Sequence, residues 1–219
     1  MNMIRLRRSV LSVPANKERM VHKAMGLNAD EIMLDLEDSV PVQDKEGARR
    51  AAIACFQEAD FGPKVRACRI NDMQTPYAYR DIIDIVEQAG TSVDVLVVPK
   101  VAGPAHVSAI DLVLSQIETA LNLTRKIGIE ACIETAEGLS QAEAIAASSD
   151  RVEALVFGVA DFTASMGAPP IGVSGHGEGE TGQGRWYSVL CRLAVAAKAN
   201  GLQVIDAPYG DHSDPEGLF

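Results

Sequence analysis

The stretch that decides the fold reads ADEIMLDLEDSVPVQDKEGAR at residues 29–49. An apolar run at residues 31–36 has the length of one strand buried on both faces. Acidic residues follow this run at once, and helical spacing then extends over residues 44–56. A buried strand, a charged turn and a helix in this order predict one βα unit.

The same pattern recurs along all 219 residues. Further apolar runs typical of buried strands occupy residues 9–13, 65–70, 95–98, 127–133, 154–157 and 202–205. Segments with helical spacing alternate with them at residues 17–26, 77–89, 105–121, 139–147 and 186–200. The alternation predicts an α/β fold with a parallel sheet. Periodicity alone leaves open a doubly wound open sheet and a (β/α)8 TIM barrel.

Charged residues gather where six of the seven predicted strands end. They are Asp35, Glu37 and Asp38 after the second strand, and Arg69, Lys100, Glu134, Asp161 and Asp206 after the later ones. In a barrel, the carboxyl ends of all strands meet at the face where barrel enzymes place their chemistry. An open sheet would bring fewer of these residues together, at its switch point. The pattern therefore favours a barrel and an enzyme.

Most of these residues also have a purely structural interpretation. The acids at 35–38 could form a solvated turn, Arg69 could pair with an acid, and Lys100 could be a surface lysine. Glu134 is harder to explain in this way, because a carboxylate at the end of a buried strand is costly unless it is paired or metal-bound. Glu134 is therefore the strongest single indication of a functional site.

The acids also indicate which metal the chain would bind. Carboxylate oxygens suit Mg²⁺, with Mn²⁺ as the alternative, rather than Zn²⁺. The four histidines, at positions 22, 106, 176 and 212, show no metal-ligand spacing. Because Mg²⁺ takes only one or two protein carboxylates, the rest of its shell is left for water and substrate.

The composition narrows the class of protein further. With 20 Lys and Arg against 30 Asp and Glu, the formal charge is −10, which argues against nucleic acid and anionic lipid as partners. Four scattered cysteines without CxxC spacing favour a reduced, cytoplasmic protein. No run of about 18 apolar residues exists, so no membrane span is expected. The length and the 47% hydrophobic content fit a single domain.

Several of these segments together resemble malyl-CoA lyases and their relatives in the citrate lyase β-subunit-like superfamily of 2-oxo-acid aldolases. The resemblance covers nearly the whole chain in order, and no single motif carries it. The matching segments are RSVLSVPANKERM at 8–20, the opening stretch at 29–49, RIND at 69–72, VVPKV at 97–101, GIEACIETAEGL at 128–139, ASSDRVEALVFGVADF at 147–162 and IDAPYGDHSDPEG at 205–217.

The resemblance implies a (β/α)8 barrel assembled as homotrimers or hexamers. It also implies Mg²⁺ and Claisen-type chemistry between an acyl-CoA and a 2-oxo acid such as glyoxylate. By motif, Glu134 and Asp161 would be the metal ligands and Arg69 the enolate-stabilising cation. Asp35, Glu37 and Asp38 would line the site, with Glu37 and Asp38 as further catalytic candidates. Arg8, Lys17 and Lys45 would meet the phosphates of CoA.

The chain also departs from the family pattern. Family members continue past the segment at 205–217 through another helix, an eighth strand and often a lid that carries an acid. We therefore expect residues 1–219 to form one barrel domain that lacks its last βα unit and its C-terminal lid. The glycine-rich stretch at 167–184 matches no family motif.

Three other functions remain open from the sequence. One is a class II pyruvate aldolase that works without CoA, and another is a Schiff-base aldolase that uses Lys100. The third is a non-catalytic, lyase-like subunit. A basic N-terminal cluster favours a polyphosphate ligand, and so CoA; its members are Arg5, Arg7, Arg8, Lys17, Arg19 and Lys23.

Overall fold

The computed structural model describes residues 5–169, 185–210, 213 and 216. Among these residues it contains the strands β1 (Val10–Pro14), β2 (Glu31–Asp35), β3 (Val65–Arg69), β4 (Val95–Val98), β5 (Gly128–Ile133), β6 (Val152–Phe157) and β7 (Gln203–Ile205). The helices are α1 (Glu18–Met25), a 3-10 turn η1 (Val42–Asp44), α2 (Lys45–Glu58), α3 (Ala78–Ala89), α4 (Pro104–Ala120), α5 (Ala136–Ser140), α6 (Ala142–Ala146), α7 (Val159–Ser165) and α8 (Tyr187–Ala199).

The strands are hydrogen-bonded in chain order, from β1 to β7. The pairs β1–β2, β2–β3, β3–β4 and β6–β7 are parallel. This order rules out a doubly wound sheet, in which the strand order reverses at a switch point. The predicted α/β fold with parallel strands is confirmed.

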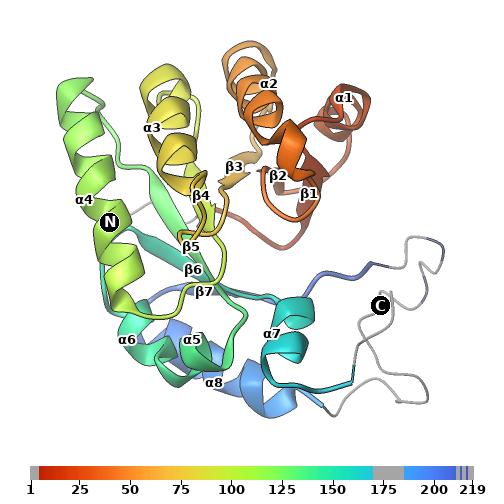
Figure 1. Ribbon diagram of the computed structural model, residues 1–219, viewed down its shortest axis with the longest axis vertical. Helices are drawn as coiled ribbons and strands as arrows, with labels where there is room; N and C mark the ends of the chain where they lie inside the picture. Colours follow the sequence, from red (N-terminus) through yellow and green to blue (C-terminus); the bar gives the residue numbers. More distant parts are fainter. Residues whose placement is uncertain (1–4, 170–184, 211–212, 214–215, 217–219) are drawn as a thin grey trace. The chain divides into compact units, whose positions relative to one another are not determined.

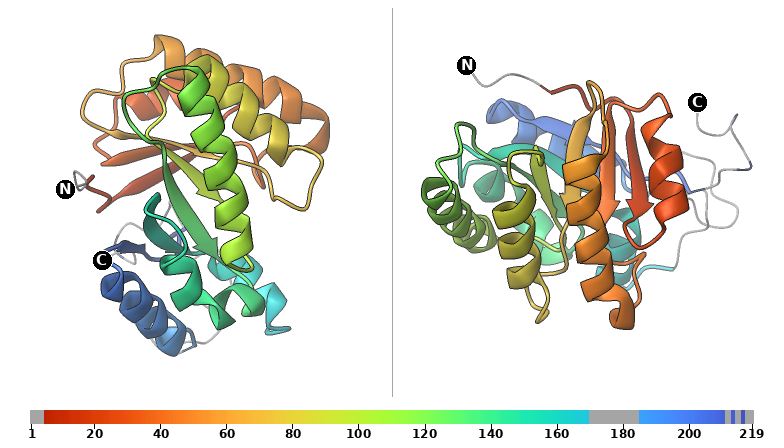
Figure 2. Two further views of the ribbon diagram at one scale, coloured as in Figure 1. Left: turned by 90° about the vertical axis from the view of Figure 1, so that its left-hand side faces the viewer. Right: turned by 90° about the horizontal axis from the view of Figure 1, so that it is seen from above.

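The chain packs as two compact units. The first unit holds Met1–Pro99 and Ala109–Glu130, and the second holds Lys100–Ser108 and Ala131–Phe219. In the first unit, α1, α2 and α3 lie along one side of β1 to β4 (Figure 1; Figure 2). In the second unit, α8 packs against β6, β7 and α6.

The strands near the middle of the order are buried along their whole length. Every residue of β4 and β5 is buried, as expected for parallel strands covered on both faces. In the second unit the core is extended by an aromatic cluster, in which the Phe162 ring meets those of Phe157 and Trp186 edge to face. Within the described residues, none of the helices has the length and apolar character needed to cross a membrane.

A buried ionic cluster in the first unit was not expected from the apolar runs that contain its acids. The Arg7 Nε donates to Glu31 Oε2 at 3.2 Å and also to Glu130 Oε1. Glu31 and Glu130 are 0% and 1% exposed. Burial and the neighbouring charge of Glu130 raise the pKa of Glu31 to about 9, against the opposing influence of Arg7. At neutral pH the two buried acids Glu31 and Glu130 therefore keep a proton that isolated carboxyl groups would release.

This cluster predicts a specific pH dependence of stability. The folded-state pKa of Glu31 lies above its ordinary value near 4.5, so its contribution is present at low pH and is lost as the pH rises towards about 9. Glu31→Gln mimics the protonated acid. Between pH 5 and pH 8, the free energy of unfolding of the wild type should therefore fall relative to that of Glu31→Gln, by on the order of 1 kcal/mol per pH unit.

Urea unfolding followed by circular dichroism measures this difference. The exposed Glu18→Gln in α1 is the matched control and should keep the wild-type pH slope. Parallel pH profiles for the wild type and Glu31→Gln would show that Glu31 is ionised in the folded state.

Candidate active site

Asp35 anchors the loop that follows β2. As the last residue of β2, it lies level with Arg69, the last residue of β3, and it is fully buried. Arg69 donates to it twice, from Nε at 2.6 Å and from Nη2 at 2.8 Å. Asp35 also accepts hydrogen bonds from the backbone amides of Glu37 at 2.8 Å and Ser39 at 3.1 Å. One carboxylate therefore fixes both the loop and the arginine.

The charge balance around Arg69 is acidic. Its Nη1 lies 3.3 Å from Glu37 Oε2 and 3.7 Å from Asp38 Oδ2, so three carboxylates surround one guanidinium. Burial alone would raise the pKa of Asp35, but the hydrogen bonds and charge of Arg69, with the bonds from Ser39 and Glu37, lower it. Asp35 is therefore ionised, and Arg69 is held as a cation among acids.

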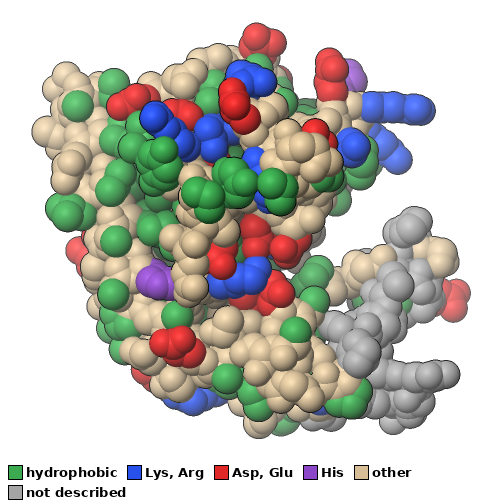
Figure 3. All heavy atoms as spheres, in the orientation of Figure 1, with side chains coloured by type: hydrophobic (Ala, Val, Ile, Leu, Met, Phe, Trp, Pro, Cys, Tyr) green, Lys and Arg blue, Asp and Glu red, His purple; other side chains and the backbone are tan. Residues whose placement is uncertain are grey.

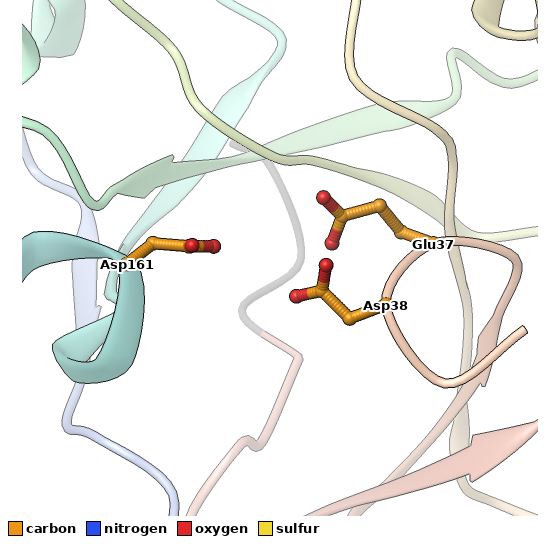
Figure 4. Close-up of side chains that lie close together, drawn as sticks. All are labelled: Glu37, Asp38 and Asp161. Carbon is orange, nitrogen blue, oxygen red and sulfur yellow. The ribbon is translucent and has the colours of Figure 1, made fainter. Parts of the chain in front are cut away.

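The loop carries two acids that differ in exposure. The Glu37 side chain is 7% exposed, whereas that of Asp38 is 59% exposed. Figure 4 shows both carboxylates projecting from this loop. Beneath it, the buried Lys45 donates to the carbonyl oxygens of Leu36 at 2.8 Å and Glu37 at 2.6 Å. Lys45, which the family resemblance assigned to a CoA phosphate, has its ammonium against these two carbonyls.

In the second unit, Glu134 follows β5 and is 3% exposed. Its Oε1 accepts the backbone amide of Lys100 at 2.7 Å. Gly158 lies so close to the other oxygen that an added Cβ would sit 2.0 Å from Glu134 Oε2. Only a glycine therefore leaves room for this carboxylate in its present position.

Asp161 is connected to Glu134 through the same lysine. It lies in the first turn of α7, and its Oδ2 is 3.0 Å from Lys100 Nζ. Lys100 has a φ of 50°, a left-handed conformation that is uncommon for a residue with a side chain. Lys100 therefore contacts both of the acids that the sequence paired as metal ligands, one through its amide and the other through its ammonium.

Exposed cations lie at the N-terminal side of the first unit. Lys17 precedes α1 and is exposed, and Lys and Arg side chains stand out over α1 in Figure 3. The Arg8 side chain is 76% exposed and makes a two-bond contact with Asp30 at 2.8 and 2.7 Å. Arg7, which the sequence grouped with these residues, is buried and paired as described above. It therefore cannot present its charge to a ligand at the surface.

The remaining residues singled out in the sequence add little to the description of the site. Asp206 follows β7 and is exposed. The glycines from 172 to 184 lie outside the described residues, as do His176 and His212. Sequence reasoning missed Gly158 and the position of Lys45. The signal for Gly158 was a glycine directly between a buried strand and the acid-bearing helix. Lys45 gave no signal, because it resembles any lysine at the start of a helix.

These features define an α/β protein with acidic and basic groups at the carboxyl ends of parallel strands, the place where enzymes of the barrel type have their active sites. Residues 8–219 match the family described as HpcH/HpaI aldolase/citrate lyase, and the chain belongs to this family. The resemblance seen in the sequence is confirmed.

Named relatives make the comparison more specific. The chain is 38% identical over 213 residues to the L-malyl-CoA/β-methylmalyl-CoA lyase of Cereibacter sphaeroides, covering 94% of this chain and 67% of the relative. It is 35% identical over 215 residues to a (3S)-malyl-CoA thioesterase of the same species, covering 96% and 66%. A solved structure of CitE from Mycobacterium tuberculosis with magnesium, acetoacetate and coenzyme A matches with a TM-score of 0.75 and 29% identity, covering 97% of this chain and 71% of that one.

The pair between Asp35 and Arg69 predicts a large effect of a small substitution. Asp35→Asn keeps the shape but removes the charge, which leaves a partly buried guanidinium with only the more distant Glu37 and Asp38 as counterions. We expect a loss of about 3 kcal/mol in the free energy of unfolding. Asp30→Asn is the matched control, because Asp30 makes the same two-bond contact with the exposed Arg8 and water replaces such a partner. Urea unfolding of both variants measures the difference. Equal losses would show that burial of the Asp35 pair has no energetic consequence.

Proposed function

We propose that this protein is a Mg²⁺-dependent carbon–carbon lyase acting on a 3-hydroxyacyl-CoA such as malyl-CoA, β-methylmalyl-CoA or citramalyl-CoA. The products of cleavage are an acyl-CoA and a 2-oxo acid such as glyoxylate, and condensation is the reverse. The observation that carries the proposal is the 38% identity to a malyl-CoA/β-methylmalyl-CoA lyase over 94% of the chain. The family membership and the charged groups of the candidate site support it.

Glu134 and Asp161 are the residues that we assign to Mg²⁺. Two carboxylates and no other protein ligand suit this ion, and both acids contact Lys100, Glu134 at its amide and Asp161 at its ammonium. The close approach of Gly158 restricts the position of the Glu134 carboxylate. When bound, a divalent cation acts as a Lewis acid on the oxygen that becomes the carbonyl of the 2-oxo acid.

Arg69 is the residue that we assign to the thioester. In cleavage, the hydroxyl proton leaves and its carbon becomes the carbonyl of the 2-oxo acid. The electron pair of the C2–C3 bond moves onto the thioester as an enolate, which then takes a proton at C2. A guanidinium stays charged at any working pH and donates in parallel, so it suits this developing oxyanion. Glu37 and Asp38, beside Arg69, are the candidate groups for moving the protons.

Arg8 and Lys17 are the residues that we assign to the phosphates of CoA. Both are exposed, and both lie in the segment that leads through β1 into α1. Lysine and arginine bind phosphate well, since charge-assisted hydrogen bonds are among the strongest that a protein makes. The ion pair with Asp30 reduces the contribution of Arg8 to phosphate binding, so Lys17 should contribute more of the binding energy for CoA.

The finer architecture is part of the same proposal. The strands in chain order and the likeness to CitE favour a single (β/α)8 barrel domain, to which the described strands contribute seven members. By family resemblance, we place this barrel in a trimer or hexamer in the cytoplasm. Light scattering of the purified protein measures the assembly directly.

A thioesterase is the second candidate function, favoured by the 35% identity to a malyl-CoA thioesterase. The two reactions leave different products from the same substrate. A lyase gives glyoxylate and acetyl-CoA and releases no free thiol. A thioesterase gives malate and free CoA, whose thiol reacts with a disulfide reagent.

Incubation with malyl-CoA and Mg²⁺ therefore tests the proposal. We expect glyoxylate, trapped as its phenylhydrazone, in amounts equal to acetyl-CoA, and no turnover with excess EDTA. Glu134→Gln removes a charged ligand, so it should lower turnover by about 100-fold or more and weaken Mn²⁺ binding measured by calorimetry. The exposed Glu137→Gln in α5 is the matched control and should retain both.

Each rival function predicts another result in this assay. Free thiol without glyoxylate would favour the thioesterase. Turnover of 2-oxo-3-deoxy sugar acids without CoA would favour the pyruvate aldolase, and borohydride trapping at Lys100 without metal would favour the Schiff-base enzyme. Binding of Mn²⁺ and CoA without turnover of any pair would identify a non-catalytic subunit.

A further inference from the structure

Lys45 occupies a position that is unfavourable for a lysine in two ways. It is the first residue of α2, where the positive end of the helix dipole repels a cation. It is also only 8% exposed, so its ammonium has lost most of its water. Burial lowers the pKa of Lys45, although the nearby acids Asp35, Glu37, Asp81 and Asp38 act against this shift. A lysine here needs a compensating interaction.

The compensation comes from two consecutive carbonyl groups of the acidic loop. Lys45 Nζ donates to Leu36 O at 2.8 Å and to Glu37 O at 2.6 Å. Leu36 and Glu37 lie between Asp35, whose side chain anchors the loop, and Asp38, whose side chain is exposed on it. A charged donor makes each bond stronger than a neutral one would.

The other polar groups of this loop are held from different directions. The amides of Glu37 and Ser39 bond to the Asp35 carboxylate, and the amide of Leu36 donates to Arg69 O at 2.9 Å. The Glu37 carbonyl also accepts a hydrogen bond from the Val40 amide at 3.0 Å, so Lys45 supplies a second, charged donor to that carbonyl and also donates to the Leu36 carbonyl. Removing the bonds from Lys45 would leave two buried carbonyls without their charged donor.

We propose that Lys45 is a positioning residue, whose ammonium fixes the Leu36 and Glu37 peptide groups so that the Glu37 and Asp38 carboxylates stay beside Arg69. This inference rests on the proposed lyase function, and it replaces a contact between Lys45 and CoA phosphate. Because the Lys45 ammonium donates to two backbone carbonyls beneath the loop, binding a phosphate would require it to leave these bonds.

Lys45→Met tests the proposal, since methionine nearly keeps the length and loses the donors. We expect kcat with malyl-CoA to fall by about 10- to 100-fold, because small misplacements of catalytic groups have effects of this size. KM for malyl-CoA and the Kd for CoA itself, measured by calorimetry, should stay within about threefold of wild type, since uniform binding is untouched. Lys45→Arg keeps the charge and the donors, so it should recover most of kcat.

Lys64→Met is the matched control. Lys64 is also a partly buried lysine that donates to a backbone carbonyl, that of Met25 at 3.1 Å. It precedes β3, at the amino end of the strand whose carboxyl end carries Arg69. Its loss should lower stability without lowering kcat. Equal kcat losses in the two methionine variants would overturn the proposal, as would an unchanged kcat with a raised KM and Kd in Lys45→Met.

Hydrogen–deuterium exchange gives a readout that needs no turnover. In the wild type and in Lys64→Met, the amides of residues 36–39 should exchange slowly. In Lys45→Met, they should exchange faster, with the amides of β6 unchanged as an internal reference. If the wild type failed to turn over malyl-CoA, the proposed function would fall while this exchange pattern still supported the bracing role. Unchanged exchange in Lys45→Met would overturn that role whatever the activity.

Discussion

The buried pair between Asp35 and Arg69 is the interaction on which the candidate site depends. Each residue ends its strand, and the register of β2 on β3 places them side by side. A buried carboxylate is tolerable only when its lone pairs are satisfied, and Asp35 meets this condition with a guanidinium and two loop amides. The shape of the loop and the orientation of the arginine are therefore set by one group.

In the second unit, Lys100 is likewise a partner shared by two functional groups. The amide of Lys100 contacts Glu134 and its ammonium contacts Asp161. In the first unit the acid at a strand end is held by a cation from the neighbouring strand end, and in the second unit a single lysine holds one acid through its amide and another through its ammonium. Charged groups fixed in this way need little reorganisation when charge develops on a substrate, which is the basis of electrostatic catalysis.

The sequence predicted the features that depend on position along the chain. Burial along β4 and β5 follows from their apolar runs, and Arg69, Glu134 and Asp161 were singled out because they follow such runs. Features that depend on contacts distant in sequence were missed. Glu31 and Glu130 lie inside apolar runs, and their partner Arg7 was read as a surface cation because its neighbours are basic. Lys45 was assigned to a phosphate by family resemblance, and nothing local in the sequence marks this lysine as buried.

Two cations of the first unit have different roles in the proposed reaction. We propose that Arg69 acts on the developing enolate and that Lys17 binds the phosphates of CoA. The most direct test is a kinetic comparison of Arg69→Lys and Lys17→Ala with malyl-CoA and Mg²⁺. Arg69→Lys keeps the charge but loses the fork, so kcat should fall by about 10²–10³, while Lys17→Ala should mainly raise KM. A kcat near wild type in Arg69→Lys, together with weaker CoA binding, would contradict the assignment of Arg69 to the enolate.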